Sequence, residues 1–321
     1  MSTAGSLRGR DLLSIGDLSR SEVDALFELA ASLKAEFRSS HGHAHPALAG
    51  RTLAMLFQKP SLRTRVTFEA GAAQLGGHAI YLTNEVVLGA RESVRDVARN
   101  LERFVDAIVV RTGPHEVAVE LAAQAAVPVI NGLTLREHPC QALADLFTIR
   151  ERFGGFEGVV LAFVGDGNNV YHSLALLGAM LGIEVRLAHP AGYAPNPRIV
   201  ERAQALAAEN GGRIVFGRDP AEVVAGASVV YTDAWTSMGQ EAEAGRRREV
   251  FAPYQVNEHI MSLAKPGAFF MHCLPAHRGE EVTAEVFESP ASVVFDQAEN
   301  RLHCQKALLL MLLAPPLGMV K

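Results

Sequence analysis

Short apolar runs alternate with amphipathic segments along most of the chain, and this alternation predicts the secondary structure. The runs Thr52 to Phe57 and Val159 to Val164 are almost entirely apolar, as is typical of strands that are buried on both faces. Segments with helical spacing of apolar residues follow most of these runs. The order strand, helix, strand predicts parallel sheets covered by helices on both faces, so the expected fold class is α/β with doubly wound sheets.

The same pattern gives each predicted element its range. Strands are expected at 52–57, 78–82, 107–111, 128–131, 159–164, 184–188, 213–216, 228–232, 268–272 and 292–295. Helices are expected at 21–37, 61–75, 92–104, 116–126, 138–152, 170–181, 197–210, 220–225, 257–263 and 301–313. The charged tract 241–249 is expected to form a mobile lid or a solvated loop.

Length and punctuation predict two domains. A chain of 321 residues exceeds the usual range of a single hydrophobic core, and Gly154-Gly155 interrupts the pattern near its middle. We therefore expect a first domain at residues 1–153 and a second at 154–300. The helix within 301–321 is expected to pack back onto the first domain.

Composition excludes several classes of function. A net charge of -5 and an isoelectric point near 6.2 argue against nucleic acids and membrane surfaces as partners. No apolar run approaches the roughly 20 residues of a membrane span, and no export signal is expected. The three cysteines form no CxxC pair, so a reduced cytoplasm fits better than a disulfide framework or a structural zinc site. The histidines of tract 39–45 have no other ligand near them in sequence, and no metal is expected.

The stretch Ser61-Leu62-Arg63-Thr64-Arg65 suggests chemistry most directly. It follows the strand 52–57 and opens a helix, where unpaired backbone N–H groups and the helix dipole favour an anion. The alternative is a serine-capped surface helix with solvated arginines. Arg111 and the segment after Asn131 also follow predicted strands, and the carboxyl ends of parallel strands share one edge of a sheet.

The glycine-rich segment 165–170 invites a dinucleotide-binding interpretation, but the match is weak. Val170 replaces the third small residue of that fingerprint, and His189 stands where a ribose-binding acid is expected. Asn169 suits a zwitterionic amino acid because an amide offers both donors and an acceptor. Asn168 suits the cap of its own helix equally well.

Two later segments also follow predicted strands. Asp233 can pair with an ammonium group, and Ser237 can add a hydrogen bond. Cys273 has no base spaced to activate it, so we interpret it as a polar lining residue and not as a nucleophile. Leu274-Pro275 is a candidate cis bond. Arg301 is expected at the start of the last helix.

Together these segments resemble the aspartate/ornithine carbamoyltransferase family, in order and over nearly the whole chain. Asp233 and the Ser-Met-Gly triplet resemble the ornithine branch, as opposed to the aspartate, putrescine or N-acylated-ornithine branches. The motifs that carry the resemblance are Ser61 to Arg65, His138-Pro139-Cys140-Gln141, Asp166-Gly167-Asn168-Asn169, Asp233 with Ser237-Met238-Gly239, and His272-Cys273-Leu274-Pro275.

The resemblance implies a fold, an activity and an assembly. It implies two parallel α/β domains with the active site in the cleft between them. It implies transfer of the carbamoyl group from carbamoyl phosphate to the δ-amine of L-ornithine, giving L-citrulline and phosphate in arginine biosynthesis or catabolism. No cofactor is implied, and a homotrimer is expected, with active sites completed by a neighbouring subunit.

The resemblance also implies a role for individual residues. Carbamoyl phosphate is expected to bind Ser61, Leu62, Arg63, Thr64, Arg111, His138, Gln141, Cys273, Leu274 and Arg301. Arg63, Arg111, His138, Gln141 and Cys273 are expected to act in catalysis. Ornithine is expected to bind Asn169, Asp233, Ser237 and Met238.

One position departs from the family pattern. Members carry a glutamine before a Leu-Gly pair in the loop that reaches the neighbouring subunit, whereas Val87 precedes Leu88-Gly89 here. Either Arg91 or another loop residue replaces that contact, or the contact is absent.

Three alternative functions stay open. They are a carbamoyltransferase for another amine acceptor such as putrescine or an N-acylated ornithine, a non-catalytic amino-acid-binding paralogue, and a dehydrogenase of similar sheet architecture.

Overall fold

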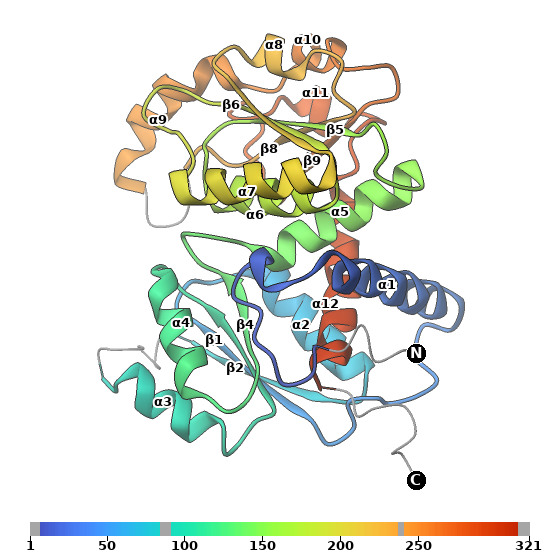
Figure 1. The fold of residues 1–321 in the computed structure, drawn as a ribbon, viewed down its shortest axis with the longest axis vertical. Helices are drawn as coiled ribbons and strands as arrows, with labels where there is room; N and C mark the ends of the chain where they lie inside the picture. The colour runs from blue at the N-terminus through green and yellow to red at the C-terminus, as the bar shows by residue number, and fades with distance from the viewer. Residues whose placement is uncertain (1–6, 84–90, 237–240, 314–321) are drawn as a thin grey trace. The chain divides into compact units, whose positions relative to one another are not determined.

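The computed structural model describes residues 7–83, 91–236 and 241–313, and the chain divides into two compact units. The first unit combines Met1–Ala144 with Asn300–Lys321, and the second is Asp145–Glu299. The dividing points lie inside two helices, α5 (Pro139–Phe153) and α12 (Val294–Leu313), whereas the sequence pattern places the division at Gly154-Gly155. Figure 1 traces the chain through its labelled elements.

The first unit is built on a four-stranded parallel sheet with the order β2-β1-β3-β4. Its strands are β1 (Thr52–Phe57), β2 (His78–Leu82), β3 (Ala107–Arg111) and β4 (Val129–Leu133). Its helices are α1 (Arg20–Ser40), α2 (Leu62–Gln74), α3 (Val94–Leu101), α4 (His115–Gln124), and the short 3-10 turn η2 (Ile15–Asp17). A parallel bridge from Leu12 to Ile130 sets the N-terminal segment beside β4.

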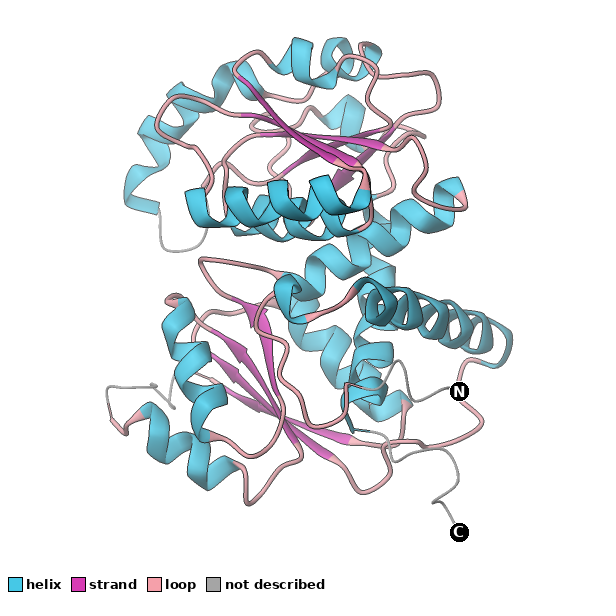
Figure 2. Cartoon of the chain, in the orientation of Figure 1, coloured by secondary structure: helices cyan, strands magenta, loops and turns pink. Residues whose placement is uncertain are grey.

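Helices cover both faces of this sheet because successive strand residues point to opposite faces. Ala54 and Leu56 of β1 pack into one apolar cluster with Val97 of α3 and Leu121 of α4. Met55, between them in sequence, is fully buried on the other face, where α2 and α12 lie (Figures 1 and 2). The continuous apolar run of β1 therefore reflects burial on two sides, as the sequence predicts.

The second unit is built on a five-stranded parallel sheet with the order β7-β6-β5-β8-β9. Its strands are β5 (Val160–Val164), β6 (Glu184–Ala188), β7 (Arg213–Gly217), β8 (Val229–Thr232) and β9 (Phe269–His272). Its helices are α6 (Asn169–Met180), α7 (Pro197–Asn210), α8 (Pro220–Val224), α9 (Ala244–Phe251), α10 (Glu258–Ser262) and α11 (Ala284–Phe287), with the 3-10 turns η3 (Glu241–Glu243) and η4 (Ala252–Tyr254). Nowhere in the described ranges is a helix both long and apolar enough to cross a membrane.

The helices of the second unit also form two layers. Ala162 and Val164 of β5 pack against Phe251 of α9 and Val286 of α11 on one face. Helices α6 and α7 lie together on the other face, as Figure 2 shows. Both sheets are thus parallel and covered on both sides, which confirms the predicted fold class of two α/β domains.

In each sheet the chain order reverses at one pair of neighbouring strands. These pairs are β1 with β3 in the first unit and β5 with β8 in the second. Loops that leave two such strands diverge to opposite faces, so ligands of open parallel sheets bind beyond the carboxyl ends of this pair. The topology thus selects two loop pairs to search for binding residues.

The prediction of a strand at 292–295 is wrong. Within the described chain this segment contributes an isolated bridge from Ser292 to Phe270 and then turns into α12 at Val294. The side chain of Val294 is buried in the core, whereas that of Phe295 is 66% exposed, so the apolar run does not continue inward. Because the helix begins early, Arg301 lies within it and not at its start.

The prediction that tract 241–249 is a solvated loop is also wrong, whereas its alternative, a mobile lid, stays a prediction. The tract forms η3 and most of α9, and Arg247 and Phe251 of this helix are buried. The remaining charged residues described on α9 lie on its solvent side or at its edge. Local charge concealed the helix because its buried face contains an arginine in place of an apolar residue.

A buried lysine ties α12 to the rest of the first unit. Nζ of Lys306 lies 3.0 Å from Oε1 of Gln74 in α2 and 2.8 Å from Nε2 of His43. Nδ1 of His43 lies 2.7 Å from a carboxylate oxygen of Glu36 in α1, so the histidine tract takes part in a local hydrogen-bond network. The Lys306 side chain is fully buried, and this burial lowers its pKa to about 8.

Lys306 should give the folding stability a pH dependence that Lys306→Met lacks. An unfolded lysine holds its proton to about pH 10.4, whereas Lys306 releases it near pH 8 in the folded chain. The unfolded state binds more protons between these values, so the wild-type free energy of unfolding should rise with pH there. We expect it to rise by about 2 kcal/mol relative to Lys306→Met between pH 7.5 and 10, measured by urea unfolding. Parallel curves for the two proteins would contradict this assignment.

Candidate active site

The turn after β1 places a capped helix N-terminus at the carboxyl edge of the first sheet. Ser61 is the N-cap of α2, and its Oγ accepts a hydrogen bond from the N–H of Thr64 at 3.3 Å. Arg63 lies in the first turn of the same helix. The side chain of Leu62 is 72% exposed, so Leu62 offers this turn its backbone N–H. The capping alternative is therefore correct for Ser61, and it coexists with the positive end of the helix dipole, which favours an anion.

Arg111 ends β3, the strand next to β1, and pairs in register with Phe57. The β3–β4 pairing shifts register at Arg111, a type of irregularity that redirects a side chain at a strand end. The carbonyl of Arg111 accepts from the N–H of Gln58 at 2.9 Å, and the Thr112 hydroxyl donates to the side chain of Gln58. These bonds fasten the two loops of the first switch point to each other.

Arg301 joins three helices of the first unit. From α12, its Nη1 donates to Oε1 of Gln141 in α5 at 2.7 Å, and its Nη2 donates to Oγ1 of Thr64 in α2 at 2.9 Å. The N–H of Gln141 donates to the carbonyl of His138 at 3.0 Å. A planar guanidinium makes such forked contacts with fixed geometry, so Arg301 holds the α2 turn and the His138 segment in register.

Three arginine charges act on the buried imidazole of His138. Burial and the charges of Arg301, Arg111 and Arg63, in that order, hold the pKa of His138 well below its ordinary value. The imidazole is therefore neutral at pH 7 and can donate an N–H to a carbonyl oxygen. Several guanidinium groups around a neutral donor suit an anion that also carries a carbonyl group.

One contact that supports the His138 segment cannot be read from the local sequence. The buried carboxylate of Glu137, the preceding residue, accepts hydrogen bonds from Oγ of Ser14 at 2.5 Å and from the N–H of Ile15 at 3.0 Å. The side chain of Asn131 donates to the carbonyl of Leu13 at 2.8 Å. The N-terminal segment therefore fixes the loop between β4 and α5.

In the second unit, Asn168 joins the loops that follow β5 and β8. Its Oδ1 accepts from the N–H groups of Val170 and Tyr171, which caps α6. Its Nδ2 donates to Oδ2 of Asp233 at 2.8 Å. Asn168 thus performs the capping role that the sequence allowed, while Asn169 is the partly buried first residue of α6.

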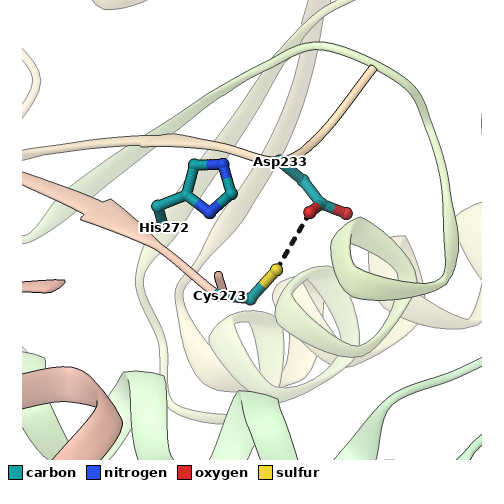
Figure 3. A group of neighbouring side chains, drawn as sticks. All are labelled: Asp233, His272 and Cys273. Carbon is teal, nitrogen blue, oxygen red and sulfur yellow. Dashed lines mark hydrogen bonds between the residues drawn. The ribbon is translucent and has the colours of Figure 1, made fainter. Parts of the chain in front are cut away.

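The carboxylate of Asp233 is held by further donors. Figure 3 shows Asp233 after β8, with His272 and Cys273 at the end of β9. The Cys273 thiol donates to Oδ1 of Asp233 at 2.9 Å, and the N–H of Ala234 donates to the same oxygen at 2.8 Å. A thiol that donates its hydrogen is not a thiolate, which supports the interpretation of Cys273 as a polar lining residue.

The ligand atoms of Asp233, His272 and Cys273 lie within 4.8 Å of one another, a spacing that a metal ion can bridge. Both ring nitrogens of His272 make other contacts. Nε2 lies 3.1 Å from Oε1 of Glu281, and Nδ1 accepts from the N–H of Leu274 at 2.8 Å. A metal ion would have to displace one of them, so we interpret this group as a hydrogen-bonded cluster. The expectation that no metal is used stays a prediction.

The pair of His272 and Glu281 also holds the turn that follows β9. Leu274 has a φ of 61°, in the left-handed region that few residues other than glycine adopt, and its N–H is the one that His272 accepts. Burial acts to raise the pKa of Glu281, but the hydrogen bond and charge of His272 and two backbone hydrogen bonds together outweigh it, and the net shift is downward. The predicted cis bond Leu274-Pro275 is confirmed.

The glycine turn after β5 has a structural explanation that requires no nucleotide. Gly165 has a φ of 146°, which favours glycine. A Cβ on Gly167 would lie 2.3 Å from the backbone nitrogen of Pro195, so the chain itself occupies the space beside this glycine. The N–H of Gly167 also donates to the carbonyl of Tyr193 at 3.0 Å. The weak dinucleotide interpretation therefore gains no support from this turn.

The predicted site residues come together in two groups, one within each unit. The first group contains Ser61, Leu62, Arg63, Thr64, Arg111, His138, Gln141 and Arg301. The second contains Asn169, Asp233, Cys273 and Leu274. Ser237 and Met238, predicted to bind ornithine, lie outside the described residues, as does Val87.

Two family models match almost the whole chain. The model described as "Aspartate/ornithine carbamoyltransferase, carbamoyl-P binding domain" matches residues 10–151. The model described as "Aspartate/ornithine carbamoyltransferase, Asp/Orn binding domain" matches residues 157–312.

Individual proteins are similar over the same length. The ornithine carbamoyltransferase of Anoxybacillus flavithermus is 51% identical over 314 residues, which cover 98% of this chain and 99% of the relative. A solved ornithine carbamoyltransferase from Pyrococcus furiosus superimposes with a TM-score of 0.93 at 51% identity, covering 98% and 99% of the two chains. The enzyme from Thermus thermophilus gives a TM-score of 0.85 at 47% identity, covering 94% and 98%.

Gly167→Ala should destabilise the second unit because the added Cβ meets backbone atoms that cannot rotate away. We expect a loss of about 1–3 kcal/mol in the free energy of unfolding, measured by denaturant titration. Gly155→Ala is the matched control, since a Cβ there has no atom within 4 Å and the backbone is not left-handed. Equal stability of the two variants would show that the turn does not require glycine at 167.

Proposed function

The chain belongs to the aspartate/ornithine carbamoyltransferase family, and on this premise we propose that it transfers the carbamoyl group of carbamoyl phosphate to the δ-amine of L-ornithine. The products are L-citrulline and phosphate. The observation that carries the proposal is the effect of Arg63, Arg111 and Arg301 on the neutral, buried His138. A phosphate dianion attached to a carbonyl group is the ligand that matches these charges and this donor.

Carbamoyl phosphate is the proposed ligand of the first unit. The N-terminal turn of α2, with the backbone N–H groups and the side chains of Ser61 to Thr64, binds the phosphate together with Arg111. His138, Gln141 and Arg301 bind the carbamoyl group, with Cys273 and Leu274 as the further contacts that the resemblance implies. The match of residues 10–151 to a carbamoyl phosphate-binding domain supports this assignment.

Ornithine is the proposed ligand of the second unit. The carboxylate of Asp233, oriented by Asn168 and Cys273, pairs with an ammonium group of the amino acid. Asn169, Ser237 and Met238 are the further proposed contacts. The relatives named above all carry ornithine in their names, which favours ornithine over the aspartate that the family description also includes.

The proposed reaction needs a free amine, and the site favours it. A side-chain ammonium with a pKa near 10.4 is deprotonated in fewer than about one molecule in a thousand at pH 7. Neighbouring guanidinium groups disfavour a further positive charge, so they shift the bound substrate towards the amine. The nitrogen lone pair then forms a bond to the carbamoyl carbon, and the carbonyl oxygen becomes an oxyanion.

Collapse of this tetrahedral intermediate breaks the bond from carbon to the bridging phosphate oxygen. The electron pair leaves with the phosphate, which also accepts the proton released by the nitrogen. Arg63, Arg111 and His138 stabilise the charges on the oxyanion and the leaving phosphate. The protein therefore supplies position and charge, and it requires no strong general base.

The proposal extends to assembly and cellular role. Leu62, Val66 and Ile80 of the first unit are large apolar side chains exposed by 40% or more, and such surfaces favour association. We propose a homo-oligomer, with the family's trimer as the expected form, acting in arginine metabolism. A cytoplasmic location fits the cysteines, which form no disulfide in the described chain.

Arg63→Ala should lower the rate of citrulline formation at least a hundredfold. Loss of one such transition-state donor costs about 3 kcal/mol. The rate is measured with saturating carbamoyl phosphate and ornithine. Arg65→Ala is the control, because Arg65 pairs with Glu69 on an exposed face of the same helix. Near-normal turnover of a folded Arg63→Ala protein would contradict the phosphate assignment.

Asp233→Asn should raise the KM for ornithine about tenfold or more, because the amide keeps the size of the carboxylate but loses the charge that pairs with ammonium. The KM for carbamoyl phosphate should stay within about twofold. Initial-rate kinetics with each substrate varied in turn measure both values. An equal rise in the two KM values would contradict the division of ligands between the two groups.

A further inference from the structure

Arg247 is a buried arginine that neither the sequence motifs nor the proposed mechanism uses. Its side chain is 4% exposed, whereas that of Arg248, the next residue of α9, is 59% exposed. A buried guanidinium is costly unless its charge and its N–H groups are satisfied. The contacts that satisfy this guanidinium therefore indicate why an arginine is buried at this position.

Arg247 donates to both loops of the second switch point. Its Nη2 donates to the carboxylate of Asp166 in the loop after β5, and its Nε donates to the carbonyl of Trp235 in the loop after β8. The first loop continues into Asn168 and Asn169, and the second begins with Asp233. One side chain thus spans the two loops from which the proposed ornithine ligands come.

Aromatic rings restrict where this guanidinium can lie. Its central carbon lies 4.8 Å from the ring centre of Tyr193 and 5.1 Å from that of Phe251. The backbone carbonyl of Tyr193 also accepts the hydrogen bond from the N–H of Gly167. The rings and the forked hydrogen bonds leave Arg247 one position, so it acts as a rigid connection between the loops.

The charge of Arg247 also controls the acidic groups around it. Burial raises the pKa of Asp166, the hydrogen bond and charge of Arg247 lower it, the charges of Asp233 and Glu243 raise it, and the net shift is upward. Asp233 and Glu243 are thus both near enough to repel the carboxylate of Asp166. Without Arg247, Asp166 would lose the hydrogen bond and the charge that offset its burial, so its pKa would rise further and the link between the two loops would be lost.

We infer that Arg247, through its ion pair with Asp166, is a positioning residue that sets the affinity for the amino-acid substrate. In the proposed mechanism, Arg247 touches no reacting atom. It fixes the distance between the two loops, and with it the position of Asp233, the carboxylate that the substrate ammonium meets. The inference rests on the proposed function, because it assumes that the Asp233 group binds ornithine.

The experiment compares the two KM values in variants of this pair. Arg247→Gln and Asp166→Asn should each raise the KM for ornithine about tenfold or more, since each leaves one buried partner unsatisfied. The KM for carbamoyl phosphate and kcat should stay within about threefold. In the double variant the effects should not multiply, because the contact that both changes remove is the same one.

Two further variants separate positioning from general stability. Arg247→Lys keeps the charge but cannot make both forked contacts, so it should also raise the ornithine KM, with a melting temperature near that of the wild type. Arg248→Gln, on the solvent side of α9, should leave both KM values unchanged. If Arg247→Gln fails to fold, Arg247→Lys and the double variant decide the question.

The outcomes distinguish the inference from the function on which it rests. If the wild-type protein forms no citrulline from ornithine, the proposed function is wrong. If the wild type forms citrulline but Arg247→Lys and the double variant keep an ornithine KM within about twofold, the inference is wrong. The inference is also wrong if kcat falls and both KM values rise together with a loss of melting temperature, because that result indicates a structural role alone.

Discussion

The forked contact of Arg301 with Gln141 and Thr64 is the interaction on which the first half of the site depends. It brings α12, which comes from the end of the chain, against α2 and α5, so residues more than 200 positions apart come together at the proposed anion site. The same guanidinium contributes, with Arg63 and Arg111, to the field that keeps His138 neutral. Arg301 therefore both positions the helices around His138 and contributes to the positive potential that acts on it.

Gathering these cations has a cost in the unliganded chain. Like charges close together in a medium of low dielectric repel one another, and the fold must hold them there. The contacts of Glu137 with the N-terminal segment and the buried attachment of Lys306 help to hold the surrounding elements in place. A site that is arranged before the substrate binds does not have to reorganise in the transition state, which is the main source of electrostatic catalysis.

The second half of the site follows the same topological rule with different chemistry. Its switch point gathers carboxylates and amides, and Asp233 is held by an amide, a thiol and a backbone N–H. Its charges are balanced by Arg247 where the first half has an excess of cations. The electrostatics of the two groups thus differ as expected for the two proposed ligands, an anion in the first unit and an amino acid in the second.

Much of this arrangement can be predicted from the sequence because burial on two faces leaves a direct trace. The apolar runs of β1 and β5 indicate parallel sheets, and polar residues directly after them indicate the ligand edge. The capping of α2 and the cis bond at Leu274 also follow from local residue types.

Other features depend on distant partners and leave no local trace. Residues 292–295 have the composition of a strand, but pairing with Phe270 extends over one bridge before α12 begins. The local sequence does not reveal helix α9, because one of its two buried residues is an arginine whose partners come from two other loops. Glu281 and Glu137 likewise take their roles from contacts with His272 and Ser14.

The most direct test of the whole account is a comparison of acceptors with the purified wild-type protein and carbamoyl phosphate. L-Ornithine, putrescine, N-acetylornithine and L-aspartate are supplied separately, and each carbamoylated product is measured. The proposed function predicts that citrulline forms from ornithine, with a kcat/KM at least about a hundredfold above that of any other acceptor. A preference for another acceptor, or the absence of any carbamoylated product, would contradict it.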